Sequence, residues 1–173
     1  GEVIKSKILI NAAGPWINET VNNVLKINSK KSIRLVRGSH IITKKLYNEE
    51  VAFTLQNEDN RIVFVIPYKE EFSLIGTTEV DVNTPDNPSI SDDEKIYLIN
   101  TINNHFIKQI SQEDIVDTYS GIRPLIEDFK EASKVTRDYV FDLSSNNNKS
   151  PLLNIYGGKL TTYRKLSEKV MEE

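Results

Sequence analysis

Two runs of β-branched and aromatic residues on either side of a polar gap constrain the fold of this sequence more than any other feature. The runs are Arg61–Ile66 and Phe72–Thr78, and residues Pro67–Glu71 separate them. This spacing is typical of a β-hairpin, in which two adjacent strands run antiparallel. The middle of the chain is therefore expected to form antiparallel sheet.

Further elements on both sides of the hairpin indicate a mixed fold. Ser91-Asp-Asp-Glu94 has the pattern of a capping box that opens a helix. Apolar residues continue this helix at helical spacing, namely Ile96, Ile99, Ile102, Phe106 and Ile110. Other helices are expected from Pro15 onward and over Arg164–Glu173, and other strands over Lys7–Asn11, Ser32–Thr43, Val51–Leu55, Ile115–Ile122, Val135–Phe141 and Leu152–Tyr156. The predicted fold class is α+β, a mainly antiparallel sheet with helices on one face.

The composition is that of an ordinary folded domain and excludes several classes of function. The 173 residues are 38% hydrophobic and 27% charged, with a formal net charge of −3, so no broad basic surface exists to hold nucleic acid. The absence of cysteine excludes disulfides, thiolate nucleophiles and cysteine-bound metals, and the presence of only two histidines argues against a zinc site. No apolar run approaches about 18 residues and no signal peptide is found, so we expect a soluble, intracellular domain.

Both ends of the sequence indicate that the chain is a piece of something longer. Lys7–Asn11 has the apolar character of a buried strand, although almost no chain precedes it. Arg164–Glu173 stops within a helical pattern, without a glycine or a proline to end it. Truncation explains both observations, and natural fraying of the two ends is the alternative.

Two of the six arginines stand where they could bind a single anion. Arg123 is expected at the end of a strand that Pro124 stops, and Arg137 at the opening of the next strand. If these strands are antiparallel neighbours, the two guanidinium groups converge, and such groups match phosphate or carboxylate bidentately. The alternative is that each arginine pairs with a nearby Asp or Glu on a solvated edge.

The segment Gly157-Gly-Lys-Leu-Thr-Thr162 follows an expected strand and opens an expected helix. Backbone N–H groups at a helix N-terminus attract negative charge, and glycine allows a ligand to approach closely. The segment lacks the G-x-x-x-x-G-K-[ST] spacing, so a nucleotide-binding P-loop is not supported. An ordinary strand-to-helix turn capped by threonine explains the segment equally well.

The two histidines differ in their surroundings. His40 follows Gly38-Ser39 inside a β-rich run. A neutral imidazole there can take a proton from a substrate hydroxyl, or it can satisfy a buried hydrogen bond without any catalytic role. His105 lies off the apolar stripe of the expected helix, so we assign its side chain to solvent.

Eight short motifs occur in an order that points to a known family. They are Asn11-Ala-Ala-Gly-Pro-Trp16, Arg37-Gly-Ser-His40, Leu55-Gln-Asn-Glu-Asp59, Arg61-Ile-Val-Phe-Val-Ile-Pro67, Ile75-Gly-Thr-Thr78, Tyr119-Ser-Gly-Ile-Arg-Pro-Leu125, Thr136-Arg-Asp-Tyr139 and Gly157-Gly-Lys-Leu-Thr-Thr-Tyr163. Together they closely resemble the FAD-dependent, quinone-linked sn-glycerol-3-phosphate dehydrogenases, over nearly the whole chain. The larger group is the amino-acid-oxidase-like flavoproteins, whose substrate domain is an antiparallel sheet with helices on one side.

The G-x-G-x-x-G dinucleotide fingerprint of this family is absent from the sequence. The resemblance therefore implies a central part of the enzyme, in which residues 1–30 form one edge of the FAD-binding domain. Residues 31–151 would form the substrate-binding domain, and residues 152–173 the returning edge of the FAD-binding domain. The full-length enzyme would use FAD as its cofactor, and we expect this fragment alone to bind none and to be inactive.

The resemblance also implies a reaction and a role for each candidate residue. Glycerol 3-phosphate would be oxidised at C2 to dihydroxyacetone phosphate, with a hydride passed to the flavin. His40 would take the hydroxyl proton, Arg123 would hold the reacting oxygen, and Arg137 would bind the phosphate. Lys159 would stabilise negative charge on the reduced flavin or the alkoxide. The cofactor-binding residues would be Gly158, Lys159, Leu160, Thr161 and Thr162 near the pyrimidine edge of the flavin, together with Gly14, Pro15 and Trp16. We expect the side chains of His40, Arg123, Arg137 and Lys159 to line one concave face.

The implied partners are glycerol 3-phosphate and a membrane quinone, without a metal ion. The parent enzyme would be cytoplasmic and peripheral on the cytoplasmic membrane, and it could form a homodimer. Two alternatives stay open: an oxidase of the same family that passes electrons to oxygen, and a non-catalytic phosphate-binding module. Oxygen uptake against quinone reduction separates the two enzymes, and an upstream G-x-G-x-x-G in the parent gene would exclude the module.

Overall fold

The expected hairpin is present in a computed structural model, which describes residues 1–27, 31–126, 139–144 and 150–173. Strand β4 (Ile62–Tyr68) pairs antiparallel with strand β5 (Phe72–Gly76), and Tyr68 lies opposite Phe72. Lys69 and Glu70 lie in the turn between these strands, with backbone φ angles of 47° and 58°. These left-handed conformations let the chain reverse within three residues.

Strand β4 is longer than the sequence predicted, because it continues through Pro67 and Tyr68. Proline removes a backbone donor, so it is tolerated where a strand has a free side. The neighbouring strand β3 (Phe53–Gln56) pairs with β4 only as far as Val65. Pro67 therefore lies beyond the part of β4 that β3 covers.

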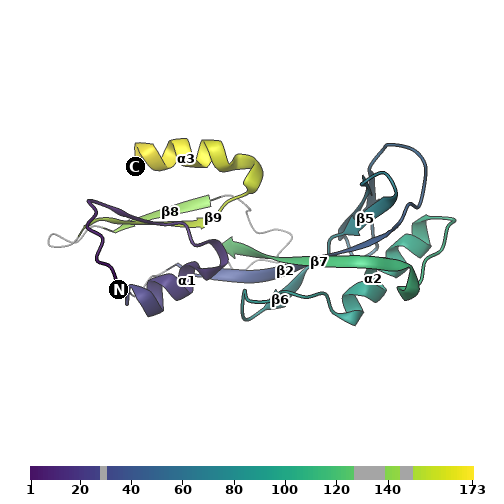
Figure 1. Ribbon diagram of the computed structural model, residues 1–173, viewed down its shortest axis with the longest axis horizontal. Coiled ribbons are helices and arrows are strands. Elements are labelled where there is room, and N and C mark those ends of the chain that lie inside the picture. Colours follow the sequence, from purple (N-terminus) through teal and green to yellow (C-terminus); the bar gives the residue numbers. More distant parts are fainter. Residues whose placement is uncertain (28–30, 127–138, 145–149) are drawn as a thin grey trace. The chain divides into compact units, whose positions relative to one another are not determined.

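The hairpin belongs to a six-stranded sheet with the order β3-β4-β5-β2-β6, in which β7 also pairs with β2 (Figure 1). The pairs β3–β4, β4–β5 and β2–β5 are antiparallel. The remaining strands are β2 (Ile33–Lys44), β6 (Val80–Val82) and β7 (Ile115–Ile126). The predicted α+β class with a mainly antiparallel sheet is confirmed, and β6 is a short strand that the sequence pattern did not predict.

Pro124 does not stop strand β7 as expected, because the strand continues to Ile126. In the described residues β7 pairs with β2 alone, so one of its edges is open. A proline whose missing donor falls on an open edge interrupts no hydrogen-bond ladder. Arg123 consequently lies within a strand and not at its end.

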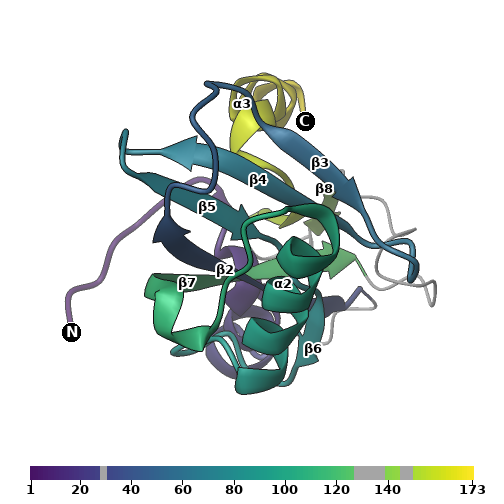
Figure 2. The same ribbon diagram turned by 90° about the vertical axis from the view of Figure 1, so that its right-hand side faces the viewer.

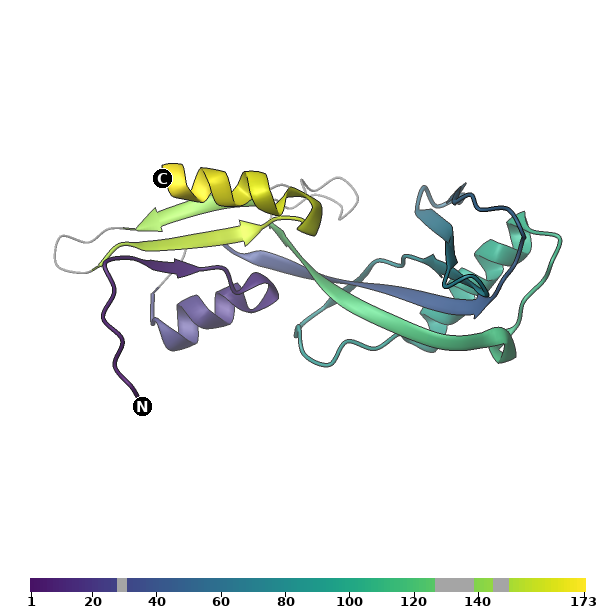
Figure 3. The same ribbon diagram turned by 45° about the horizontal axis from the view of Figure 1, so that its top comes forward.

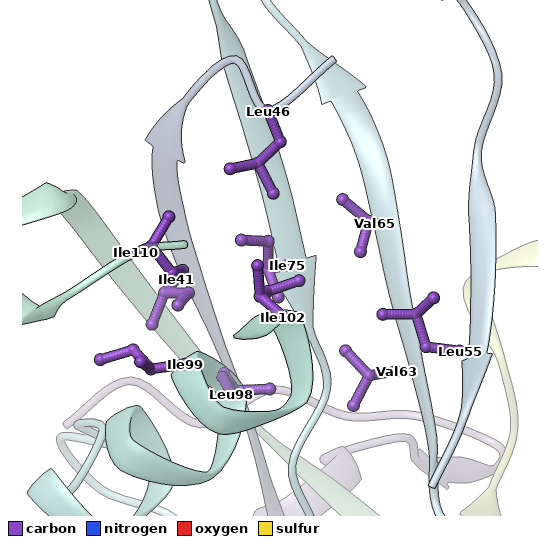
Figure 4. Close-up of a cluster of buried hydrophobic side chains, with 10 residues drawn as sticks. All are labelled: Ile41, Leu46, Leu55, Val63, Val65, Ile75, Leu98, Ile99, Ile102 and Ile110. Atoms are coloured by element: carbon purple, nitrogen blue, oxygen red, sulfur yellow. The ribbon is translucent and has the colours of Figure 1, made fainter. Parts of the chain in front are cut away.

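Helix α2 (Asp92–His105) packs on one face of the six-stranded sheet (Figure 2). Its capping box is present as predicted, with Ser91 as the N-cap and Glu94 as its partner. Figure 4 shows the core between the helix and the strands, which consists of Ile41, Leu46, Leu55, Val63, Val65, Ile75, Leu98, Ile99, Ile102 and Ile110.

The predicted apolar stripe of α2 is partly wrong. Ile96, a predicted member of the stripe, is 45% exposed, whereas Leu98, which was not predicted to belong to it, is completely buried. Glu94 is buried at the start of the helix, and Leu98 and Ile102 follow it at four-residue intervals. The buried face of the helix therefore runs through these three residues. The helix ends at His105, whose side chain is exposed as expected, and Ile110 reaches the core from the segment that follows.

A second, three-stranded sheet joins the two ends of the chain in the order β1-β9-β8. Strand β1 (Leu9–Asn11) runs parallel to β9 (Leu152–Gly157), and β8 (Tyr139–Ser144) runs antiparallel to β9. Leu9 and Ile10 are 44% and 45% exposed in this chain, whereas Asn11 is buried. In the residues that the structure describes, β1 has a partner strand on one side only.

Short helical segments lie on both sides of this small sheet (Figure 3). The helix expected after Pro15 is three consecutive segments: η1 (Gly14–Trp16), α1 (Ile17–Glu19) and η2 (Thr20–Val24). Ile17 and Val21 pack in a small core with Ile33 of β2 and Tyr156 of β9. On the other side are η4 (Leu160–Thr162) and α3 (Tyr163–Glu172). No helix within the described ranges is long and apolar enough to cross a membrane.

The chain divides into two compact units. The terminal unit joins Gly1–Leu35 with Arg123–Glu173, and the central unit is Val36–Ile122. The sequence predicts domain boundaries after residues 30 and 151. The second structural division comes earlier in the chain, because β8 pairs along β9 and so belongs to the sheet of the terminal unit.

Candidate functional site

His40 lies on β2, between its two neighbouring strands β5 and β7 in the sheet. On β2 it is the register partner of Gly76 on β5. Its imidazole ring also stacks on Tyr119 of β7, with ring centroids 4.6 Å apart and planes only 6° from parallel. A Cβ atom added to Gly76 would lie 2.2 Å from Cδ2 of His40. The imidazole is therefore held between an aromatic ring on one neighbouring strand and a glycine on the other.

The imidazole is on the face of the sheet that helix α2 does not cover. Ile41 points into the core beneath α2, and successive side chains of a strand point to opposite faces, so His40 points the other way. Along β4 this open face is apolar, with Ile62, Phe64 and Ile66 exposed by 48%, 43% and 39%. Phe64 pairs with Gly76 in the same row as His40. The open face thus combines the imidazole of His40 with exposed apolar side chains.

The buried carboxylate of Glu94 lies on the opposite side of the same strands. Glu94 is 4% exposed and accepts hydrogen bonds from the hydroxyls of Ser39 at 2.8 Å, Thr78 at 2.6 Å and Ser91 at 2.9 Å. It also accepts from the Ser91 backbone N–H at 2.8 Å and forms an ion pair with Arg37 at 2.5 Å. Five donors therefore converge on a single carboxylate.

These contacts decide the protonation state of Glu94. Burial by itself raises the pKa of a carboxyl group, but the hydrogen bonds from Thr78, Ser91 and Ser39 lower it more, and the pKa of Glu94 falls to about 2. Sequence reasoning found Glu94 only as a member of the capping box. Nothing in the local pattern indicates that its other oxygen reaches Ser39, which is 55 positions away.

Arg123 is half-buried in β7 and belongs to the terminal unit. Arg137 lies outside the described residues. The expected convergence of the two arginines on one anion therefore stays a prediction. The same holds for the shared concave face, because His40 belongs to the central unit and Lys159 to the terminal unit.

Both predicted cofactor segments leave the same end of the small sheet in the terminal unit. Strands β1 and β9 are parallel, with Asn11 opposite Asn154, so their carboxyl ends point in one direction. The segment of Gly14, Pro15 and Trp16 follows β1, and the segment of Gly158 to Thr162 follows β9. The carboxyl ends of parallel strands are the usual place for ligand-binding segments in such sheets.

Two buried asparagines tie these strands together. The side chain of Asn11 donates a hydrogen bond to that of Asn154 at 2.9 Å, and its own oxygen accepts from the Ala13 backbone N–H at 3.3 Å. Gly14 follows with a φ of +56° and begins the turn of Pro15 and Trp16. The first cofactor segment is thus fixed to the end of β1 by its own backbone conformation and by Asn11.

The second cofactor segment is shaped by glycine. Gly157 and Gly158 have φ angles of +76° and +97°, which side chains rarely permit. Lys159 is extended and exposed, and Leu160 is 89% exposed. Helix α3 begins only at Tyr163, after the single turn η4, so the segment does not open directly into a long helix as expected. Among the described residues, no three His, Asp or Glu side chains gather as possible metal ligands.

Comparison with known proteins assigns the chain to a family. Residues 1–164 match the family model described as FAD dependent oxidoreductase. The chain belongs to this family. It is 48% identical over 167 residues to the aerobic glycerol-3-phosphate dehydrogenase of Escherichia coli (strain K12), covering 95% of this chain and 33% of that protein. It is also 41% identical over 169 residues to the D-erythritol 1-phosphate dehydrogenase of Brucella abortus (strain 2308), covering 96% of this chain and 34% of that protein.

A solved structure from the same family shares the fold. The glycerol-3-phosphate dehydrogenase from Bacillus halodurans complexed with FAD is 27% identical to this chain, with a TM-score of 0.80. The match covers 99% of this chain and 32% of that protein. The resemblance drawn from the eight motifs is confirmed, and the chain spans about a third of the length of the relatives that it matches.

Proposed function

We propose that the protein to which this chain belongs oxidises sn-glycerol 3-phosphate at C2 to dihydroxyacetone phosphate, with FAD as the hydride acceptor. The observation that carries the proposal is the similarity, along nearly the whole chain, to relatives named glycerol-3-phosphate dehydrogenase. The activity is proposed for the whole protein, because this chain corresponds to about a third of such relatives.

The terminal unit offers groups that fit FAD. At Gly14 an added Cβ would meet nothing within 4 Å, so the backbone there is open to a ligand. Trp16, Lys159 and Leu160 are exposed on the two segments that leave the carboxyl ends of β1 and β9. Residues 14–16 and 158–162 would hold the cofactor. When bound, FAD supplies a two-electron acceptor for the hydride from the substrate.

The side chains of this protein would handle the proton and the charges. His40 would take the proton of the C2 hydroxyl while the C2 hydrogen leaves as a hydride, so that a ketone forms. Its ring is confined between Gly76 and Tyr119, which presents the imidazole in one plane. Arg123 would hold the reacting oxygen, Lys159 would stabilise its negative charge, and Arg137 would bind the phosphate.

We further propose that the electrons pass to a quinone, and that the whole protein is a cytoplasmic enzyme, peripheral on the cytoplasmic membrane, able to form a homodimer. These proposals rest on the resemblance to quinone-linked enzymes of the family.

The test uses the full-length protein loaded with FAD. We expect glycerol 3-phosphate to reduce a soluble quinone analogue rapidly under argon, and oxygen uptake without quinone to be slow. Fast oxygen uptake would instead identify an oxidase. A protein that retains FAD but turns over no polyol phosphate with either acceptor would reject the proposed function.

D-erythritol 1-phosphate is a second candidate substrate, favoured by the similarity to a relative named for it. Both compounds offer a phosphate and a secondary alcohol, so they would need the same kinds of side chains: a cation for the phosphate and a base for the hydroxyl proton. Comparison of kcat/KM for the two substrates on the same preparation separates them, and we expect the larger value for glycerol 3-phosphate.

A further inference from the structure

Three hydroxyl-bearing residues lie next to, or close to, His40 and the residues that pack against its imidazole. Ser39 is the neighbour of His40 on β2, Ser120 is the neighbour of Tyr119 on β7, and Thr78 stands two residues after Gly76. The Ser120 hydroxyl donates to the Ser39 hydroxyl at 2.8 Å. Each residue of the imidazole stack thus has a hydroxyl-bearing residue close to it in sequence, below the sheet.

All three hydroxyls lead to one carboxylate. Ser39 and Thr78 both donate to Oε1 of Glu94, and Ser120 reaches it through Ser39. A carboxylate only accepts, so each hydroxyl must donate toward Glu94 and keep its lone pairs for another donor. Thr78 accepts from the backbone N–H of Ser39 at 3.0 Å, and Ser39 accepts from Ser120. Ser39, Thr78 and Ser120 thus form a hydrogen-bonded string of hydroxyls, and the ionised state of Glu94 fixes the direction of every hydrogen bond in this string.

We infer that Glu94 is a positioning residue for His40, which it holds from the opposite face of the sheet through Ser39, Thr78 and Ser120. The inference rests on the proposed function, in which His40 takes the substrate proton. Glu94 touches neither the imidazole nor the open face, so it acts through the placement of three strands. Arg37 forms an ion pair with the carboxylate, and the hydrogen bonds from Ser39, Thr78 and Ser91 keep it ionised beneath the sheet.

Glu94→Gln in the full-length, FAD-loaded protein tests the inference. The amide is a donor as well as an acceptor, so at least one of the converging donors would face an N–H group. The strands would then shift and displace the imidazole of His40. A displaced catalytic group of this kind lowers kcat strongly, so we expect kcat with glycerol 3-phosphate to fall about 10- to 100-fold, with little change in KM or in FAD content. Asp93→Asn is the matched control, because Asp93 is an exposed acid in the same helical turn. We expect it to leave kcat unchanged.

A double-mutant cycle with His40→Ala separates positioning from general damage. If Glu94 acts through His40, Glu94→Gln lowers kcat in the wild-type background and has no further effect when His40 is already alanine. An equal decrease in both backgrounds would overturn the inference, and so would a wild-type kcat in Glu94→Gln. A wild-type kcat in His40→Ala alone would instead reject the proposed role of His40.

Ser120→Ala provides a milder test if Glu94→Gln does not fold. The variant removes only the last hydroxyl of the string and leaves Glu94 its five donors. We expect a decrease in kcat of roughly 2- to 10-fold, the range of one neutral hydrogen bond, and no decrease when His40 is alanine. An unchanged kcat in the wild-type background, or the same decrease without His40, would contradict the inference.

Discussion

The two candidate regions of this molecule are built by different means. Around His40 in the central unit, the geometry is set by side chains: the Tyr119 ring on one side, the absent side chain of Gly76 on the other, and hydroxyls below. At the carboxyl ends of β1 and β9 in the terminal unit, the geometry is set by the backbone. Gly157 and Gly158 take conformations that other residues avoid, while the side chains that follow are exposed.

This difference teaches where each region is vulnerable. A region held by packed side chains should respond to small changes of shape or of hydrogen-bond direction, because its neighbours cannot move away freely. A region held by backbone torsions should respond to loss of a glycine and tolerate changes in exposed side chains. The predictions below, apart from the one on Arg137, each test one side of the comparison.

The largest effect is expected when His40 itself is removed. His40→Ala in the full-length protein should lower kcat by about 10²-fold or more, the usual contribution of a general base. It should also remove an ionisation from the acidic limb of the pH–rate profile. Steady-state kinetics over a range of pH measure both. A near-normal kcat with an unchanged profile would make His40 structural, and the proton would then go to water or to another residue.

Arg137→Ala tests the proposed binding of the substrate phosphate. The phosphate does not react, so its contact should be similar in the ground state and the transition state and should affect chiefly KM. A hydrogen bond to a charged group contributes about 1.5–3 kcal/mol, which corresponds to a KM increase of roughly 10- to 150-fold. A decrease in kcat with normal KM would contradict this assignment.

Acid should weaken the central unit through Glu94. Its pKa in the folded state, about 2, lies below the usual 4.5, so the stabilisation is complete above pH 4.5 and is lost as pH falls toward 2. The shift corresponds to about 3 kcal/mol. Urea denaturation between pH 7 and pH 3 measures the larger part of this loss, about 2 kcal/mol, in the full-length protein. We expect Glu94→Gln to be less stable at pH 7 and to lose less on acidification than the Asp93→Asn control. Equal losses in the two variants would assign the acid sensitivity to other groups.

The sequence predicted those features whose signals are local. The hairpin of β4 and β5 follows from two apolar runs and the gap between them, and the start of α2 follows from Ser91 and Glu94. The extension of β7 through Pro124 was missed because it depends on which edge of the strand is open, and that is a property of the assembled sheet.

The candidate site was predictable in part for the same reason. Family motifs gave His40 and the two glycine-containing segments by position. They did not give the packing of His40 on Gly76, because that contact joins two strands through their register. The burial of Glu94 beneath β2 was also invisible, since its partners Ser39 and Thr78 come from other segments of the chain. Long-range contacts of this kind leave no periodic signal in the sequence.

Gly76→Ala tests the side-chain packing at its closest point. The new Cβ would overlap the imidazole of His40, so the ring must leave its place. Overpacking of this kind costs about 1–3 kcal/mol, and kcat should fall by roughly 5- to 150-fold. Gly121→Ala is the control, because an added Cβ there meets nothing within 4 Å. Equal kinetics for the two variants would show that the stack tolerates displacement.

Gly158→Ala tests the backbone side of the comparison. At a φ of +97° any side chain is strained, and the variant should lose about 1–3 kcal/mol of stability, together with affinity for FAD. Leu160→Ala removes an exposed side chain from the same segment and should change the stability by less than about 0.5 kcal/mol. Thermal unfolding and flavin content of the full-length variants measure both effects. A greater loss for Leu160→Ala than for Gly158→Ala would mean that side chains hold this segment too.

Tyr119→Leu should have the smallest effect and the most specific one. The substitution keeps an apolar side chain on the open face but removes the ring that stacks on His40. An aromatic pair contributes about 0.5–1.5 kcal/mol beyond its buried area, and Tyr119 is about half exposed, so the lower end applies. This corresponds to a decrease in kcat of roughly 2- to 5-fold, because the imidazole gains freedom to tilt while its partner Gly76 is unchanged. Tyr119→Phe keeps the stacked ring and is the matched control, which should retain the wild-type kcat. Equal decreases in the Leu and Phe variants would assign the effect to the Tyr119 hydroxyl, and His40 would then be confined by Gly76 and the strands alone.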